Sequence, residues 1–379
     1  MPFHFNISRR DFLEAISAQQ NITNKKGTLA ILSNVLIEVR NNEVIFTGTD
    51  LEVSLRQTVS AEVFENGTLT APSKKLFELA RESGSEVINF QEEDKNWIKI
   101  TAGNSTYKLA GMVSEEFPQF EQYAEESLVE MEGNIICDLI DKTIFSIAAD
   151  KENMYNLTAA HLQKIEADGK NMLRMVTSDG HRLSIMSREA ESLAGLHFDG
   201  YILIPRRGVQ QIRKFSEERD TFQLGIEKRR MVLKSDDAVL VIRLMEGEFP
   251  DFENILKCIS SENNIVIKKL LFLESLKRVN LFTEDIFHAI RFEVNNNQLV
   301  LTSQNADSGS ARDEMAIEYN GESLSMGFNC RYFIDALQVL EGESIQASVG
   351  SDESPCLISS DEDKGFLGII MPMKLNSPS

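Results

Sequence analysis

Apolar and polar residues alternate along several short stretches of the chain, which predicts β-strands with one buried face. Clear cases are the segments at 35–39 (VLIEV), 290–294 (IRFEV) and 299–303 (LVLTS). Other stretches carry apolar residues at the three- and four-residue spacing of a helix that buries one side. Six such helices are predicted, at residues 8–21, 74–84, 137–149, 206–219, 268–284 and 331–341. Alternating strands together with amphipathic helices predict an α+β fold.

The predicted elements recur three times, at a period of about 125–130 residues. A strand that ends in a polar turn appears three times. The turn residues are Asp50, Asp179 and Asn305. A strand that leads into a helix with a basic start also appears three times. The basic residues are Lys74, Arg207 and Arg331. We therefore expect three similar domains, at 1–123, 124–253 and 254–379, each with two helices backed by antiparallel sheets.

Charge is distributed unevenly along this pattern. The chain has 39 Lys and Arg against 59 Asp and Glu, a formal net charge of −20, yet the six predicted helices together carry a small positive charge. If these helices share one surface, that surface attracts phosphates while the rest repels them. The alternative is that the basic residues are ordinary solvated helix faces. The concentrated positions are Arg9, Arg10, Lys74, Lys75, Arg206, Arg207, Arg213, Lys214, Lys268, Lys269, Lys277 and Arg278.

Several classes of protein are disfavoured by what the sequence lacks. It has no apolar run of about 18 residues and no secretion signal, so we expect a cytoplasmic protein. Its four cysteines are far apart, and no phosphate-binding, zinc-protease or nucleophile motif occurs, so we expect no metal, no cofactor and no catalytic residue. A nuclease using Asp50, Asp179 and Asp251 as metal ligands is the enzymatic alternative. Turn aspartates that recur one repeat apart are more simply explained as acceptors of backbone N–H bonds.

The chain closely resembles the bacterial sliding clamp, the β subunit of replicative DNA polymerase III. The segments that carry the resemblance are GTDLE (48–52), TSDGHRL (177–183), IPRRGV (204–209), GEFPDF (247–252), MGFNCRYFIDAL (326–337) and MPMKL (371–375). The resemblance implies a non-catalytic processivity factor of DNA replication: a head-to-tail homodimer of three-domain subunits that forms a closed ring around double-stranded DNA, without sequence preference. It also implies that the replicative polymerase, the clamp loader and other proteins bind it through a short motif. An interaction scaffold that never touches DNA is the remaining alternative.

The resemblance also assigns roles to residues. A hydrophobic pocket for the partner motif is implied at Leu157, Thr177, Gly180, His181, Arg182, Leu183, Pro250, Ile255, Ile369, Ile370, Met371, Pro372, Met373 and Leu375. His181 and Arg182 are expected to supply its polar edges, and residues 376–379 either cover or extend it. Additional DNA contacts are expected at Lys25 and Lys26 in a loop of the first domain, and at Arg331 from its place in the repeat. The dimer interface is implied to join Tyr107 and Leu109 of one subunit to Leu281 and Phe282 of the other.

Overall fold

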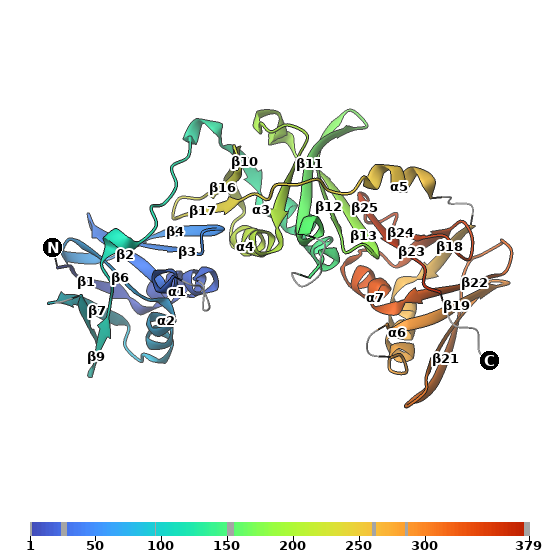
Figure 1. Ribbon diagram of the computed structural model, residues 1–379, viewed down its shortest axis with the longest axis horizontal. Helices are drawn as coiled ribbons and strands as arrows, with labels where there is room; N and C mark the ends of the chain where they lie inside the picture. The colour runs from blue at the N-terminus through green and yellow to red at the C-terminus, as the bar shows by residue number, and fades with distance from the viewer. Residues whose placement is uncertain are drawn as a thin grey trace. The chain divides into compact units, whose positions relative to one another are not determined.

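The structure is a computed structural model that describes residues 2–23, 29–94, 96–149, 155–259, 263–284 and 287–374. The chain divides into two compact units, which are described separately (Figure 1). Unit 1 comprises Met1–Gly133, Ala194–Phe198 and Gln210–Leu244. Unit 2 comprises Asn134–Leu193, Asp199–Val209 and Met245–Ser379. The second of the three repeats is therefore shared between the units.

Unit 1 contains two antiparallel sheets. The first has the order β5-β1-β7-β8-β9, with β1 (His4–Ser8), β5 (Glu62–Glu65), β7 (Val87–Glu93), β8 (Trp97–Ala102) and β9 (Ser105–Ala110). The second has the order β10-β15-β16-β17-β4-β3-β2-β6, with β10 (Val129–Glu132), β15 (Thr221–Glu227), β16 (Arg230–Lys234), β17 (Ala238–Arg243), β4 (Val53–Ser60), β3 (Glu43–Thr49), β2 (Asn34–Arg40) and β6 (Gly67–Pro72). Helices α1 (Arg9–Ile22) and α2 (Ser73–Glu82) lie side by side against these sheets, and α4 (Arg206–Glu217) ends in this unit (Figure 1).

Unit 2 also contains two antiparallel sheets. The larger has the order β14-β11-β12-β13-β25-β24-β23-β18, with β14 (Tyr201–Pro205), β11 (Ala159–Ala167), β12 (Lys170–Ser178), β13 (Arg182–Glu189), β25 (Phe366–Ile370), β24 (Cys356–Ser359), β23 (Ser344–Val349) and β18 (Asn263–Lys268). The other has the order β21-β20-β19-β22, with β21 (Gly309–Ala316), β20 (Gln298–Asn305), β19 (Ala289–Asn295) and β22 (Leu324–Asn329). Its helices are α3 (Gly133–Asp141), α5 (Phe252–Cys258), α6 (Lys269–Asn280) and α7 (Cys330–Val339).

Aromatic side chains fill the core between helices and sheets. In unit 1, α1 buries Phe12, Ala15, Ile16 and Gln19, the spacing of one helix face. The Phe12 ring meets that of Phe90 at 5.0 Å, edge to face. In unit 2, the Phe272 ring of α6 meets that of Phe333 of α7 at 5.8 Å. The apolar periodicity that predicted these helices is therefore the pattern that buries them.

The repeat predicted from sequence is visible in single hydrogen bonds. The side-chain oxygen Oδ1 of Asp50 accepts the backbone N–H of Glu52 at 3.0 Å and of Val53 at 2.7 Å. Asp179 and Asn305 make the same pair of bonds to the second and third residues that follow them. Asp251 instead caps α5 by accepting the N–H of Asn254. All four side chains thus act as backbone acceptors, as the turn interpretation predicted.

Each large sheet is two half-sheets of successive repeats joined at one strand pair. In unit 1 the joining strands are β17 and β4, with Leu240 opposite Leu55. In unit 2 they are β25 and β13, with Gly368 opposite Ser184. We call these two strand pairs the β17–β4 seam and the β25–β13 seam.

Three helix predictions need correction. The helix predicted at 268–284 ends at Asn280. The helix predicted at 137–149 runs from Gly133 to Asp141, followed by a separate 3₁₀ turn at Ile144–Ser146. It ends because the Thr143 carbonyl accepts the Thr177 hydroxyl at 2.6 Å instead of continuing the helix. It begins at a position where only glycine fits, since a Cβ on Gly133 would lie 2.1 Å from the Arg219 carbonyl oxygen. Helix α5 was not predicted at all.

Candidate functional site

An apolar cluster in unit 2 lies where the predicted partner pocket was expected. We call the surface over this cluster, formed by α5, the 179–182 loop and residues 371–373, the slot. Of the predicted pocket residues, Leu157, Leu183 and Ile369 are buried in the cluster. The cluster also contains Ala148, Ala159, Val176, Ile185, Leu203, Phe249 and Phe252, with Met245, Leu256, Ile259, Leu357 and Leu367 packed against it.

The loop at 179–182 forms one polar edge of the slot. Gly180 has a φ of +84°, a backbone conformation that disfavours any residue with a Cβ. The His181 side chain is exposed, and the His181 carbonyl accepts the N–H of Met371 at 2.9 Å. This bond ties the loop to the end of β25, so His181 presents its ring from a fixed backbone.

Arg182 does not supply a free polar edge, contrary to the sequence interpretation. Its guanidinium donates to Asp335 at 2.6 Å, to Asp179 at 3.0 Å and to the Phe145 carbonyl at 2.5 Å. It also stacks 4.5 Å from the centre of the Tyr332 ring. Because every arm of the guanidinium is engaged, Arg182 braces the loop rather than offering hydrogen bonds to a ligand.

The rim of the slot is apolar and open to solvent. Met371 is 41% exposed and Ile255, on α5, is 40% exposed, and Pro250, just before α5, is exposed as well. Met373 is half-buried and donates its N–H to the Gly327 carbonyl at 2.7 Å. Thr177, Ile370 and Pro372 complete the predicted set: the first two are buried and Pro372 is half-buried. Leu375 and residues 376–379 lie outside the described residues.

Sequence reasoning missed the aromatic wall of this site. Phe249 and Phe252 pack with His161, their ring centres 5.2 and 5.5 Å from the imidazole, and Tyr201 stacks on it at 4.3 Å. Burial lowers the pKa of His161, so the imidazole is neutral around pH 7. The available signal was Asp251 after Pro250, a helix cap followed by apolar residues at helical spacing.

The predicted DNA-facing cations fall into two groups. Arg9, Arg206 and Lys269 bind carbonyl groups of their own fold. Arg9 donates to the Ala80 and Arg81 carbonyls at 2.8 and 2.9 Å, capping α2. Lys269 caps α7 through the Leu340 carbonyl at 2.7 Å, and Arg206 donates to the Ile147 carbonyl at 2.7 Å. These three position helices.

The other predicted cations lie on solvent-facing parts of the helices or directly at their starts. The exposed ones are Arg10, Lys74, Lys75, Lys214, Lys268, Lys277, Arg278 and Arg331, while Arg207 and Arg213 are half-buried. Some have acidic neighbours: Lys75 contacts Glu78 at 2.9 Å and Arg278 contacts Asp313 at 2.7 Å. Exposed pairs of this kind contribute at most about 1 kcal/mol and exchange readily for another anion. Lys25 and Lys26 lie outside the described residues.

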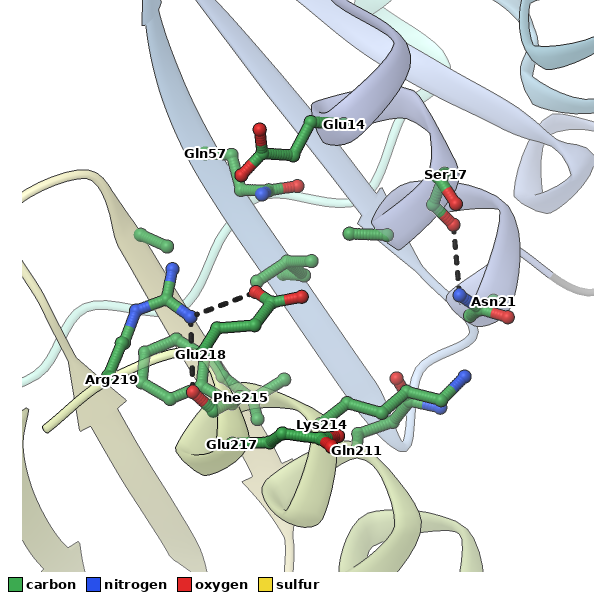
Figure 2. A pocket seen from close by; sticks show the side chains of 14 residues that line it. Glu14, Ser17, Asn21, Gln57, Gln211, Lys214, Phe215, Glu217, Glu218 and Arg219 are labelled. Carbon is green, nitrogen blue, oxygen red and sulfur yellow. Dashed lines mark hydrogen bonds and ion pairs between the residues drawn. The ribbon is translucent and has the colours of Figure 1, made fainter. Parts of the chain in front are cut away.

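The β17–β4 seam holds a cavity of about 350 Å³ between α1 and α4 (Figure 2). Ala18 of α1 lines it, with Glu218 and Arg219 after α4 on the other side. Arg219 pairs with Glu218 at 3.3 Å on its own side of the cavity.

At the β25–β13 seam, Lys142 occupies the place that corresponds to Ala18. Asp138 lies one helical turn before Lys142, as Glu14 lies one turn before Ala18. The Lys142 ammonium contacts Asp363 at 2.7 Å, Asp138 at 2.9 Å and Glu341 at 3.1 Å. One seam is therefore held by buried ion pairs at this place, and the other is hollow there.

Models of all three domains of the DNA polymerase III β subunit match the chain: the N-terminal domain at residues 3–121, the central domain at 130–251 and the C-terminal domain at 259–374. The beta sliding clamp of Chlamydia trachomatis is 30% identical, over 98% of this chain and 87% of that protein. That of Haemophilus influenzae is 31% identical, over 98% and 100%. The crystal structure of the Caulobacter crescentus beta sliding clamp has a TM-score of 0.93 at 25% identity, covering 99% of both chains.

The chain belongs to the DNA polymerase III β subunit family.

Sliding clamps of this family are non-catalytic processivity subunits of DNA polymerase III, and the dimeric ring is typical of them. This confirms the resemblance inferred from the sequence motifs and excludes the nuclease alternative. No helix in the described parts of this clamp subunit is long and apolar enough to cross a membrane.

Among the edge strands of the sheets are β9 in unit 1 and β21 in unit 2, which hold the same places in their repeats as the strands joined at the two seams. The predicted interface residues lie at these edges. Tyr107 of β9 is 40% exposed and Leu109 is half-buried. Leu281, just after α6, is 76% exposed, and the Phe282 ring lies against Gly309, 3.8 Å from the position of a Cβ there.

Proposed function

We propose that two copies of this chain join head to tail into a ring that encircles duplex DNA, and that the slot tethers the replicative polymerase, the clamp loader and other DNA-processing proteins to it. The observation that carries the proposal is the count of half-sheets. Four of the six half-sheets are joined in the two seams, and each of the remaining two has one edge, β9 or β21, that corresponds in the repeat to the strands joined at the seams. A β9–β21 contact between subunits completes the series, and two such contacts close a heterologous ring.

The repeat supports a specific register for this contact. Leu240 lies five residues before Met245, and Leu55 lies five residues after Asp50. At the β25–β13 seam, Gly368 and Ser184 hold the same places relative to Met373 and Asp179. Each of these methionines bonds the strand that precedes the second helix of its repeat, as Met112 bonds Thr70.

Counting in the same way from Met112 and Asn305 gives Tyr107 opposite Ser310 of the partner. Ser310 follows Gly309, against which Phe282 packs. The exposed Tyr107 ring would then be covered at the edge where Leu281 leaves apolar surface uncovered, beside the half-buried Phe282. Exposed apolar groups on both edges are typical of surfaces that associate.

The DNA role is supported by where the cations lie in their helices. Basic residues occupy the first turns of α1, α2, α4, α6 and α7, the positive end of the helix dipole, where a cation costs about 0.3–1 kcal/mol. Helix stability alone therefore disfavours this arrangement. An anion bound at these first turns offsets this cost, because the helix N-termini and the side-chain cations then both attract its phosphates. The contacts are proposed at the outer cations, from Arg10 to Arg331, and not at the capping Arg9, Arg206 and Lys269.

The slot suits a short apolar peptide. Its rim residues Met371 and Met373 are flexible thioethers, which adapt to different apolar side chains. Its floor is already buried and braced by Arg182, so little ordering is needed when a peptide binds. Because bacterial chromosomes are replicated in the cytoplasm, that is the proposed location, and no step of this role needs a cofactor.

The ring proposal is tested by retention on DNA. The clamp is loaded on nicked circular DNA with its cognate loader and ATP, and its co-elution with DNA is followed on a sizing column before and after the circle is cut. Loss of co-elution on cutting supports a topological link. Retention on linear DNA would mean that direct affinity holds the protein. A Lys74→Glu, Lys277→Glu variant should load poorly, whereas the charge-matched Arg40→Glu, Lys364→Glu variant should load normally.

A further inference from the structure

The slot has a counterpart one repeat earlier, in unit 1. There, the Arg243 N–H donates to the Glu52 carbonyl at 2.8 Å, as the Met371 N–H does to His181. Leu51 follows Asp50 as Gly180 follows Asp179, and it likewise has a positive φ, +75°. The cleft beside this loop has a volume of about 790 Å³. Its lining residues are Leu51, Gln119, Phe120, Glu121, Gln122, Lys228, Arg229, Arg230 and Arg243.

The chemistry of this cleft differs from that of the slot. Arg243 stands where the slot has Met371, and the β15–β16 turn adds the exposed Lys228 and Arg229. Among the described residues, neither Lys228 nor Arg243 has a side-chain hydrogen bond or ion pair. A concentration of cations on a chain of net charge −20 attracts anions locally, because the nearest charges dominate over a Debye length of about 8–10 Å.

The wall opposite the cations is preformed. Glu121 is ion-paired with Arg230, which holds the 119–122 segment on the β15–β16 hairpin. The Glu227 carboxylate accepts the Ala124 N–H at 2.6 Å and the Ser127 hydroxyl at 2.8 Å. The Arg56 guanidinium stacks 4.3 Å from the centre of the Phe120 ring. A cleft fixed by its own contacts loses little entropy when it binds a ligand.

We propose that this cleft binds an acidic, extended peptide segment of a protein partner. Carboxylates would pair with Lys228, Arg229 and Arg243, while Leu51, which is 51% exposed, and the edge of Phe120 contact the peptide's carbon atoms. Nucleic acid is the less suitable occupant, because the cleft is built from strand ends and a linker and includes no helix N-terminus. This site goes beyond the slot, since it recognises charge and does not need an apolar motif.

The probe is a fluorescein-labelled twelve-residue peptide of alternating Glu and Ser, titrated with the full-length protein and followed by anisotropy. It contains no apolar residue for the slot, and the measurement needs neither DNA nor a polymerase, so its result is independent of the ring proposal. Lys228→Glu, Arg243→Glu should weaken binding by roughly tenfold or more, as expected for reversing two charges that meet carboxylates. Arg40→Glu, Lys364→Glu changes the net charge equally at exposed sites elsewhere and should leave binding within about twofold.

Equal losses in both double variants, or no loss in either, would overturn the proposal, because the attraction would then be diffuse or located elsewhere. A single-stranded oligonucleotide that binds more tightly than the peptide and is weakened by the same pair would also overturn it, in favour of a nucleic-acid site. Thermal unfolding of each variant confirms that the comparison is between folded proteins.

Discussion

The proposed register at the subunit contact can be tested with a disulfide. Tyr107→Cys and Ser310→Cys are introduced into the same chain, so that each ring contains two such pairs. Directly opposed residues of an antiparallel pair have Cα atoms about 4.5–5.5 Å apart, within the range of about 4.4–6.8 Å that a disulfide accepts. Because both edges carry a side chain at these places on the same face, mild oxidation should convert most of the protein to a covalent dimer of twice 42.7 kDa.

Control variants distinguish disulfide formation that depends on the proposed register from disulfide formation through mere proximity of the two strands. Moving the second cysteine to Ala311 turns its side chain to the opposite face of the strand, and a disulfide should then form slowly or not at all. Each single variant and the unmodified chain show the background from native thiols, of which Cys137 is partly exposed. Non-reducing gels measure the yield. A higher yield with Ala311→Cys than with Ser310→Cys would refute the register, and a monomer with no cross-link in any variant would refute the β9–β21 contact.

Four further changes test other parts of the structure. Met371→Asp should weaken binding of a labelled peptide from the cognate polymerase by roughly tenfold or more, because it places a charge on the apolar rim. Val87→Asp, at a similarly exposed apolar site, is the control. Equal losses of affinity in the two variants would exclude the slot as the binding site of the peptide. Lys142→Met should lower the free energy of unfolding by about 1–3 kcal/mol in urea, because the fully buried Asp363 loses one of its two cationic partners and keeps only Arg188. Adding Asp363→Leu should recover part of the loss, and a loss below about 1 kcal/mol would contradict a buried network. Ala18→Lys should raise stability by roughly 0.5–1 kcal/mol by filling the seam cavity near Glu218, and a destabilised protein would refute the comparison of seams. Burial holds the pKa of His161 below its value in the unfolded chain, so the contribution of the neutral imidazole to stability is present above about pH 6.5 and is lost as the pH falls. His161→Phe should flatten the pH dependence of the free energy of unfolding, whose slope from one group is at most about 1.4 kcal/mol per pH unit. An unchanged slope would exclude a role for His161.

Local periodicity was enough to predict most of the fold. The alternating strands and the helices at 8–21 and 206–219 needed only the pattern of apolar residues, because each element buries one face. The end of α3 could not be predicted in this way, since it depends on a hydrogen bond from Thr177, which is distant in sequence. Helix α5 is a single short helix whose apolar residues pack in the slot cluster, and so few turns give a weak periodic signal.

The candidate site was predictable in composition and less so in role. The motif at 177–183 placed His181 and Arg182 together, but the sequence did not indicate that Arg182 is held by Asp335, more than one hundred residues away. In the same way, Arg9 and Lys269 look like any other basic helix residue until their carbonyl partners are known. The role of a side chain that depends on distant partners can be assigned only from the folded structure, whereas the types of residue at a surface can be predicted from the sequence.

The difference between Lys142 and Ala18 also has a mechanical consequence. Pulling the β25–β13 seam apart requires the Lys142 ammonium to be withdrawn from the Asp363 and Glu341 carboxylates of the following repeat, whereas at the β17–β4 seam the corresponding place is a cavity. The β17–β4 seam therefore deforms more under the same load, and bending and thermal fluctuation within each subunit concentrate at this seam. A chain with one stiff and one compliant joint can absorb strain without distorting the surface that surrounds Arg182.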